Sequence, residues 1–218
     1  MRDIYPIIFA AVPIGLLWGT LAVAKGLAPL EATLMSAAVF AGASQYIAID
    51  QWREPAPWAA LAVTVFIVNI RHVLMSASLS RHMNHIPKRL RAPLLFVLAD
   101  ENWAMSERRA LKQPLTLGYY VGLAAPMYVC WTTSTAIGAF AGKALGDPAA
   151  LGFDFAFSAM FIAILVGFWK GPRTGAVLAA SAGVAALVKL TVPGAWFIVA
   201  GGLAGALAAA LLHREGEA

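Results

Sequence analysis

Three polar residues with the chemistry of a binding site stand in the middle of a long apolar stretch. Asn69, Arg71 and His72 lie within residues 57–79, which are otherwise almost entirely apolar. A helix of that length, rising about 1.5 Å per residue, crosses the roughly 30 Å of hydrocarbon in a bilayer. Placing a guanidinium at that depth costs about 2.5–3.5 kcal/mol of insertion free energy even on lenient scales. We therefore expect Arg71 to have an ion-pair partner, to face a water-filled cavity or to serve a function. The stretch therefore predicts a membrane protein with a transport pathway.

The positions of these residues on a helix suggest different roles for them. Asn69 and His72 are three residues apart and share a face, whereas Arg71 points about 200° away from Asn69. The planar guanidinium of Arg71 suits a carboxylate. His72 titrates near neutral pH and could relay protons, or it could be a neutral hydrogen-bonding residue of the core.

Arg71 could pair with the carboxylate of a substrate or with one of three carboxylates of the chain. Asp100 and Glu101 lie in residues 92–106, which are otherwise mostly apolar, and Asp154 begins a later apolar segment. Asp100 and Glu101 could couple transport to protons or bind an amine, or they could meet nearby arginines at the membrane interface. Asp154 could instead stabilise the amino terminus of its own helix.

A second polar motif, Phe40-Ala-Gly-Ala-Ser-Gln45, interrupts the apolar residues 29–51. Gly42 and Ser44 let another backbone approach closely, and Gln45 carries an amide that needs a partner inside a membrane. The motif could be a packing contact in which Ser44 bonds back to its own helix. It could also break the helix, so that backbone dipoles and Gln45 hold the charged ends of a substrate.

The hydropathy of the chain predicts the helices that must position these groups. The 218 residues are 61% hydrophobic and 12% charged, with a mean hydropathy of +0.74, whereas a soluble domain carries about 25% charge. We expect an all-α, polytopic membrane protein with about seven transmembrane helices. Residues 92–106 are too short and too charged for a lipid-exposed span, so we expect a re-entrant or buried helix there. The predicted spans are residues 4–24, 29–51, 57–79, 114–142, 154–169, 174–192 and 194–212.

The basic residues predict the orientation in the membrane. Residues 80–91 and 107–113 are both rich in Lys and Arg. Because cytoplasmic loops carry the excess of positive charge, both stretches are expected inside, and residues 92–106 then do not cross. With seven spans, the amino terminus is expected outside and the carboxyl terminus inside.

A weak internal similarity suggests a 3+3 inverted repeat. Pro13-x4-Trp18 in the first span recurs as Pro126-x4-Trp131 in the fourth, and the stretch from Glu31 to Ser36 has a loose counterpart at 154–158. Inverted repeats with Pro- or Gly-interrupted helices are typical of secondary transporters. Chance could also produce the match, since Pro and Gly are common in membrane helices.

The expected organisation is a single transmembrane transporter domain over residues 1–218. Its parts are repeat one at about 4–79, a basic connector with a short helix at 80–113, repeat two at about 114–192, and a final helix at 194–212.

The sequence lacks the signatures of several other functions. The net charge of +5 comes without an aromatic-interleaved basic stretch, so no nucleic-acid partner is expected. Cys130 is the single cysteine, which excludes an internal disulfide and a multi-thiolate metal site. His82-x2-His85 has no well-placed third ligand, so no metal is predicted. There is no phosphate-binding glycine loop, so we expect no cofactor and no ATPase activity.

Four motifs occur in order along the chain: Phe40-Ala-Gly-Ala-Ser-Gln45, Val68-Asn-Ile-Arg-His72, Leu98-Ala-Asp-Glu-Asn102 and Gly152-Phe-Asp-Phe155. Together they resemble the AzlC/YgaZ family, the large subunit of bacterial branched-chain amino acid exporters. The resemblance implies export of valine, leucine, isoleucine and, in some members, methionine across the cytoplasmic (inner) membrane. It also implies a small hydrophobic partner subunit of the AzlD/YgaH type and coupling to an ion gradient. Ala99 departs from the hydroxyl residue expected before the Asp-Glu pair.

We therefore expect a secondary exporter of small aliphatic amino acids rather than an enzyme. One alternative is an intramembrane metal-dependent enzyme that uses His72, His82 and His85. Another is a membrane sensor or assembly subunit that does not transport. The candidate residues for substrate binding or coupling are Pro13, Ser36, Gly42, Ser44, Gln45, Asn69, Arg71, His72, Asp100 and Asp154.

Overall fold

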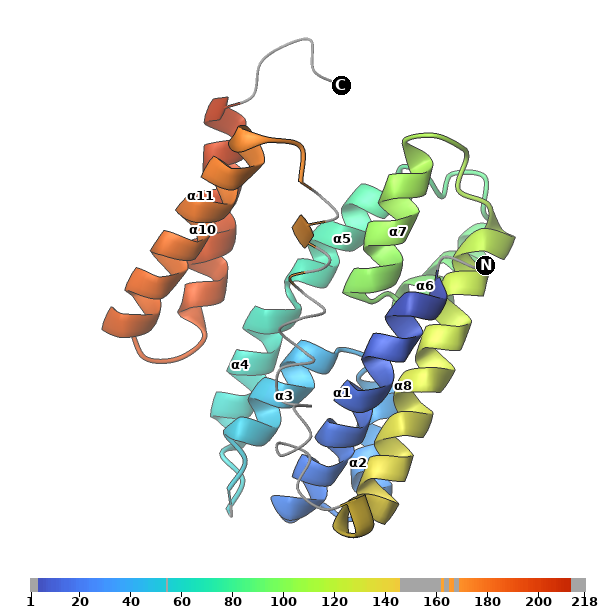
Figure 1. Ribbon diagram of the computed structural model, residues 1–218, viewed down its shortest axis with the longest axis vertical. Helices are drawn as coiled ribbons and strands as arrows, with labels where there is room; N and C mark the ends of the chain where they lie inside the picture. Colours follow the sequence, from blue (N-terminus) through green and yellow to red (C-terminus); the bar gives the residue numbers. More distant parts are fainter. Residues whose placement is uncertain (1–3, 54, 146–161, 163–164, 167–168, 213–218) are drawn as a thin grey trace.

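Helices make up the secondary structure of the described chain (Figure 1). The computed structural model describes residues 4–53, 55–145, 162, 165–166 and 169–212, and the all-α prediction is confirmed for them. Among the described residues, three helices are long and apolar enough to cross a membrane, at Tyr5–Ala24, Trp58–Ser80 and Pro172–Thr191. The helices are α1 (Tyr5–Ala24), α2 (Pro29–Ala38), α3 (Gly42–Asp50), α4 (Trp58–Asn69), α5 (Arg71–Ser80), α6 (Lys88–Phe96), α7 (Asp100–Ala110), α8 (Leu117–Leu145), α10 (Pro172–Thr191) and α11 (Trp196–Leu212).

The predicted span at residues 29–51 is wrong, because the chain turns back halfway. α2 runs into the bundle, and α3 returns to the end from which α2 entered (Figure 1). Leu27 and Ala32, around the start of α2, share a buried cluster with Ile49 near the end of α3. Phe40, at the tip between the helices, packs in a different cluster. We call α2 and α3 the first hairpin; it is re-entrant.

The break in the first hairpin has a local cause. Val39 leaves the helical region with φ −119° and ψ 75°, and Ala41 has φ −148° and ψ 83°. Val39, Phe40 and Gly42 are all weaker helix formers than alanine or leucine. Non-helical backbone at membrane depth requires cover by protein or a cavity, and Phe40 and Ala41 are buried. The helix is therefore broken at this motif, and the substrate-holding role of the break stays a prediction.

A second re-entrant hairpin replaces the one short helix expected at residues 92–106. α6 enters the bundle, and α7 runs back to the same end after a break at residues 97–99 (Figure 1). Asn102 closes the break, since its Oδ1 accepts a hydrogen bond from the Ala99 N–H at 3.0 Å and its Nδ2 donates one to the Val97 carbonyl at 2.8 Å. The segment is therefore re-entrant, as expected, but it consists of two helices.

The tips of the two hairpins meet in the middle of the bundle. Phe40 from the first tip and Ala99 from the second pack around the same cluster, which includes Ala11 of α1 and Met127 of α8. The hairpins enter from opposite ends of the bundle (Figure 1). Each tip therefore presents its free backbone groups to protein rather than to lipid.

Helices α1 and α8 run side by side in the same direction. Gly15 of α1 lies against Trp131 and Ser134 of α8, and Gly19 lies against Ala139, so the residue numbers rise together. The inverted relation expected between the first and fourth spans is therefore wrong for these two helices. The first hairpin is the cause, because it turns back and removes one membrane crossing between them.

The structure also corrects the predicted orientation of the amino terminus. The start of α1 lies at the same end of the bundle as the basic connector, since Ile7 lines a cavity together with Arg108 and Lys112. The positive-inside rule predicts that this end is cytoplasmic, so we now expect α1 to begin inside rather than outside. The carboxyl ends of α1 and α8 lie at the opposite end (Figure 1). At the cytoplasmic end, five basic residues of the described chain line two cavities that share Arg108 and Lys112; the five are Arg81, Arg108, Arg109, Lys112 and Lys170.

Cysteine labelling from each side of the membrane should place the start of α1 in the cytoplasm. In a Cys130→Ala background, Tyr5→Cys and Lys112→Cys should react from the cytoplasmic side, and Lys25→Cys from the other side. All three positions are exposed. Reaction of the cysteines at 5 and 112 from opposite sides would contradict the re-entrant course of the first hairpin.

The helices α10 and α11 form an antiparallel pair at one side of the bundle (Figure 1). Gly201 of α11 lies against Ala185 of α10, and Gly205 lies against Ser181. α10 buries none of its residues within the described chain.

Gly138→Ala should separate α1 from α8 and lower the Tm by several degrees. A Cβ at Gly138 would overlap the backbone carbonyl of Leu16, which cannot yield unless the helices move apart. Overpacking of this kind costs about 1–3 kcal/mol or more. Gly118→Ala in the same helix meets no atom within 4 Å, so its Tm should stay equal or rise slightly. Equal Tm values for the two variants would contradict the close contact.

Candidate functional site

A small internal cavity lies where the two hairpin tips meet α5. Its volume is about 30 Å³, which is room for roughly two water molecules. The wall combines charged and apolar side chains, so it suits a ligand that carries both kinds of group. The wall consists of Ala11, Phe40, Ala41, Gly42, Ala43, Arg71, His72, Ala99, Asp100, Glu101, Met127 and Trp131.

Arg71 pairs with a carboxylate of the chain, which was one of the predicted alternatives. Its Nη2 lies 3.0 Å from Asp100 Oδ2, and the two side chains are 27% and 22% exposed. Its Nε is buried and has no hydrogen-bond partner in the described part of the chain. Because buried donors are normally paired, this N–H is available for a ligand.

Glu101 adds a second carboxylate to the cavity wall. It is only 5% exposed, and the nearby Arg71 is already paired with Asp100. A buried charge without a partner is costly, so Glu101 needs a proton or a cation. His72 is the remaining titratable group of the wall, and its Nδ1 lies 3.3 Å from the backbone oxygen of Asn69.

The helices α3 and α7 both begin at this cavity. Gly42 and Ala43 come from the first turn of α3, and Asp100 and Glu101 come from the first turn of α7. First-turn N–H groups have no partner within their helix, and no side chain caps α3. The two positive helix ends favour negative charge. They therefore stabilise the carboxylates and would attract an anionic group of a ligand.

The apolar part of the wall was not predicted as a site. The Trp131 ring lies so close to Gly42 that a Cβ there would approach it to 3.0 Å. Phe40 packs edge-on against Tyr128, with ring centroids 5.1 Å apart. Gly42 therefore permits a close approach, as expected, but of an aromatic ring rather than a backbone. In a chain that is 61% hydrophobic, no sequence signal separates these wall residues from the core.

Three predicted site residues, Gln45, Ser36 and Ser44, hold the first hairpin in place instead of lining the cavity. Gln45 Nε2 donates to Ser36 Oγ at 3.1 Å, and Ser36 Oγ lies 2.9 Å from Thr135 Oγ1. Trp131 Nε1 donates to Gln45 Oε1 at 3.0 Å. Ser44 Oγ bonds back to its own helix at 2.8 Å. These buried hydrogen bonds tie the hairpin to α8.

Trp131→Phe should destabilise this attachment. The change removes the N–H that satisfies Gln45 Oε1, and a buried acceptor left unpaired costs about 1–3 kcal/mol. We expect the Tm to fall by several degrees, and Gln45→Leu added to Trp131→Phe should recover part of the loss. The control is Trp58→Phe, because Trp58 is 69% exposed. Equal Tm values for Trp131→Phe and Trp58→Phe would contradict the network.

The other predicted site residues lie away from the cavity or outside the described residues. Pro13 lies inside α1. Asn69 ends α4, and its buried Oδ1 has no hydrogen-bond partner within the described chain. Ile70 between α4 and α5 keeps helical dihedral angles, with φ −57° and ψ −25°. The common face expected for Asn69 and His72 stays a prediction, and His72 shares the cavity wall with Arg71. Asp154 lies outside the described residues, as does most of its segment, so the division into repeats stays a prediction.

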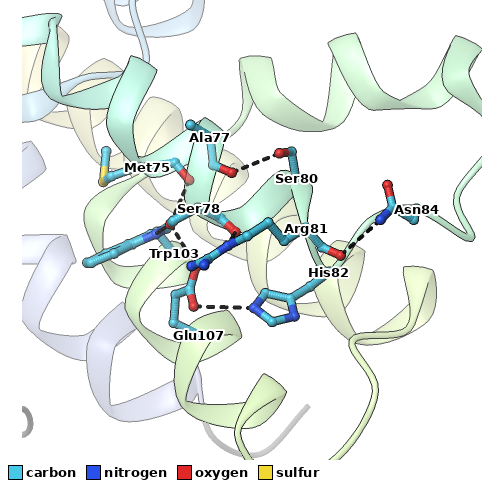
Figure 2. A network of polar contacts seen from close by, with 9 residues as sticks. All are labelled: Met75, Ala77, Ser78, Ser80, Arg81, His82, Asn84, Trp103 and Glu107. Atoms are coloured by element: carbon cyan, nitrogen blue, oxygen red, sulfur yellow. Dashed lines mark hydrogen bonds and ion pairs between the residues drawn. The ribbon is translucent and has the colours of Figure 1, made fainter. Parts of the chain in front are cut away.

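A polar network joins α5 and α7 near the cytoplasmic end (Figure 2). Ser78 Oγ donates to Glu107 Oε1 at 2.7 Å, and Trp103 Nε1 donates to Ser78 Oγ at 2.9 Å. His82 Nε2 lies 3.6 Å from Glu107 Oε2. Since an ion pair also joins the first residues of the two helices, α5 and α7 are parallel and are linked at both ends.

The histidines give the metal-dependent alternative no support. His82 lies against Glu107, His85 is exposed, and His72 belongs to the central cavity. Within the described part of the chain, no three or more His, Cys, Asp or Glu side chains are arranged so that they could hold a metal ion.

These features define a helical membrane protein in which two re-entrant hairpins of the described chain enclose a charged cavity. The chain belongs to the AzlC family, since residues 6–145 match the family described as "AzlC protein". The resemblance predicted from the four motifs is thereby confirmed.

Three relatives are similar over most of the chain. "Inner membrane protein YgaZ" of Escherichia coli is 32% identical over 95% of this chain and 87% of its own length. An "Uncharacterized membrane protein" of Archaeoglobus fulgidus is 32% identical over 93% of this chain and 89% of its own length. An "Uncharacterized membrane protein" of Haemophilus influenzae is 25% identical over 89% of this chain and 80% of its own length. No solved structure matches the chain significantly.

Proposed function

We propose that the protein is a multi-pass secondary exporter of branched-chain amino acids in the bacterial cytoplasmic membrane. Its membership in the AzlC family and its similarity to an inner membrane protein support the location. The family resemblance of the four motifs is the reason for the substrate class and for a small hydrophobic partner subunit of the AzlD/YgaH type.

The observation that carries the proposal is the composition of the central cavity. An aliphatic amino acid has a carboxylate, an ammonium group and an apolar side chain. Arg71 Nε and the amino terminus of α3 suit the carboxylate, and Glu101 suits the ammonium group. Phe40, Met127 and Trp131 suit the aliphatic side chain. Secondary transporters commonly bind their substrates between broken helices near the midplane.

The cavity must open for a substrate to enter. Its 30 Å³ compares with about 300–1,000 Å³ for pockets that hold small molecules. The hairpin tips are the non-helical parts of its wall, and they approach it from opposite ends of the bundle (Figure 1). We propose that each hairpin moves against the α1–α8 pair in turn, which would open the cavity to one side at a time.

Efflux from liposomes tests this function. Liposomes with the chain and its small subunit, loaded with labelled leucine under a pH gradient, should lose label faster than liposomes with the subunit alone. Valine and isoleucine should behave like leucine, whereas lysine and glutamate should stay inside, because their charged side chains find no partner in the apolar wall. Equal efflux of glutamate and leucine would contradict the substrate class. Leucine binding without efflux would favour the sensor alternative.

A further inference from the structure

A second cavity lies at the cytoplasmic ends of α1, α7 and α8, away from the central cavity. Its volume is about 500 Å³. The described residues of its wall include three basic side chains and no carboxylate, so the cavity is positively charged. The wall consists of Ile7, Met105, Arg108, Arg109, Lys112, Gln113 and Tyr119.

The side chain of Arg109 is fixed in this wall, and one of its hydrogen-bond donors has no partner there. Its guanidinium lies over the Tyr119 ring, 4.2 Å from the centroid, which fixes the plane of the group. Its Nε is buried and has no hydrogen-bond partner among the residues described. A planar guanidinium with a free donor matches the oxygen atoms of a phosphate group.

The helix dipole does not account for the whole basic cluster. Arg108 and Arg109 in the last turn of α7 do stabilise its carboxyl end. However, Lys112 and Gln113 follow the end of α7 at Ala110 and still line the cavity. Their side chains add a cation and an amide donor to the same wall.

We propose that this cavity binds the phosphate group of an anionic lipid headgroup from the cytoplasmic leaflet. The basic end of the bundle lies at that leaflet by the positive-inside rule, and anionic lipids concentrate there. Leu111, beside the cavity in the sequence, is 75% exposed, which suits contact with an acyl chain. This site depends on the membrane location and not on the transport function.

The thermal stability of the purified full-length protein in detergent tests the site. Phosphatidylglycerol should raise the Tm at concentrations at which phosphatidylcholine does not. Arg109→Gln and Lys112→Gln should each raise the half-saturating concentration of phosphatidylglycerol about tenfold, because each removes a charge-assisted hydrogen bond. Arg89→Gln removes the same charge from an exposed residue of α6 outside the wall, and its response should equal that of the unmodified protein.

Inorganic phosphate distinguishes the two sources of the ligand. Stabilisation by phosphate alone that is lost in both cavity variants would support a phosphate site and assign it to a soluble ligand. Equal responses to the two lipids, or an unchanged response to phosphatidylglycerol in Lys112→Gln, would overturn the site. Lys112 is exposed, so this variant stays informative even if Arg109→Gln fails to fold. An equal loss in Arg89→Gln would also overturn it, because net charge would then explain the effect.

Discussion

Arg71→Ala should reduce leucine efflux by roughly 100-fold. The change removes the N–H available to the substrate carboxylate and also the partner of Asp100, which lies 3.0 Å away. A hydrogen bond to a charged group contributes about 1.5–3 kcal/mol, and each 1.4 kcal/mol is a factor of ten. Initial rates of labelled leucine efflux, at equal protein content in the liposomes, measure the effect. Arg71→Lys keeps the charge but loses the planar fork, so we expect an intermediate rate.

The double variant Arg71→Ala with Asp100→Asn separates substrate binding from charge balance. Loss of Arg71 alone leaves Asp100 and Glu101 without their cation, which should lower the Tm. Asp100→Asn removes one of these charges, so the double variant should recover stability but not efflux. Recovery of efflux would mean that Arg71 serves as a counter-ion of Asp100 and does not bind the substrate.

The sequence predicted the helical class and the basic end of this protein but not the course of residues 29–51. Hydropathy measures whether a segment prefers lipid, and a re-entrant hairpin of two apolar helices prefers it as much as one long span does. The motif at residues 40–45 indicated a possible break, but the return of the chain appears only in the packing, in which Ala32 and Ile49 share one buried cluster. One wrong crossing reversed both the predicted side of the amino terminus and the predicted direction of α8 relative to α1.

The candidate site was predicted best where a charge lies in an apolar context. Arg71 and Asp100 met that criterion, and the structure places them together in one wall. Gln45 is neutral but is likewise a polar side chain in an apolar context, and its amide is satisfied on both sides by Ser36 and Trp131. A buried amide is costly in either role, so its residue type alone could not distinguish support of the hairpin from binding of a substrate.

The links between α5 and α7 suggest how the charged cavity could be coupled to movement. The ion pair at the start of the two helices holds them together at one end. The Ser78–Glu107 hydrogen bond holds them together near the other end (Figure 2). A shift of α7 would therefore carry α5 with it, and Arg71, Asp100 and Glu101 would move as one unit. Protonation or ammonium binding at Glu101 would then act on the position of the second hairpin.

Glu101→Gln should abolish the stimulation of leucine efflux by a pH gradient. In the cavity Glu101 faces Asp100 and the cationic or titratable side chains Arg71 and His72. As Arg71 pairs with Asp100, Glu101 is neutralised either by a proton or by the substrate ammonium group, but not by both at once. This mutual exclusion would couple export of an amino acid to entry of a proton. Glutamine has the same shape and is neutral at every pH, so it should remove the coupling.

Leucine–leucine exchange at equal pH distinguishes lost coupling from lost binding. The Glu101→Gln variant should retain this exchange, with a half-saturating leucine concentration about tenfold higher because the ammonium loses a charged partner. Glu31→Gln makes the same change at an exposed carboxylate of α2 and should keep both exchange and gradient-driven efflux. If Glu101→Gln still responded fully to the pH gradient, the proton would have to bind elsewhere, and His72 would be the next residue of the wall to test.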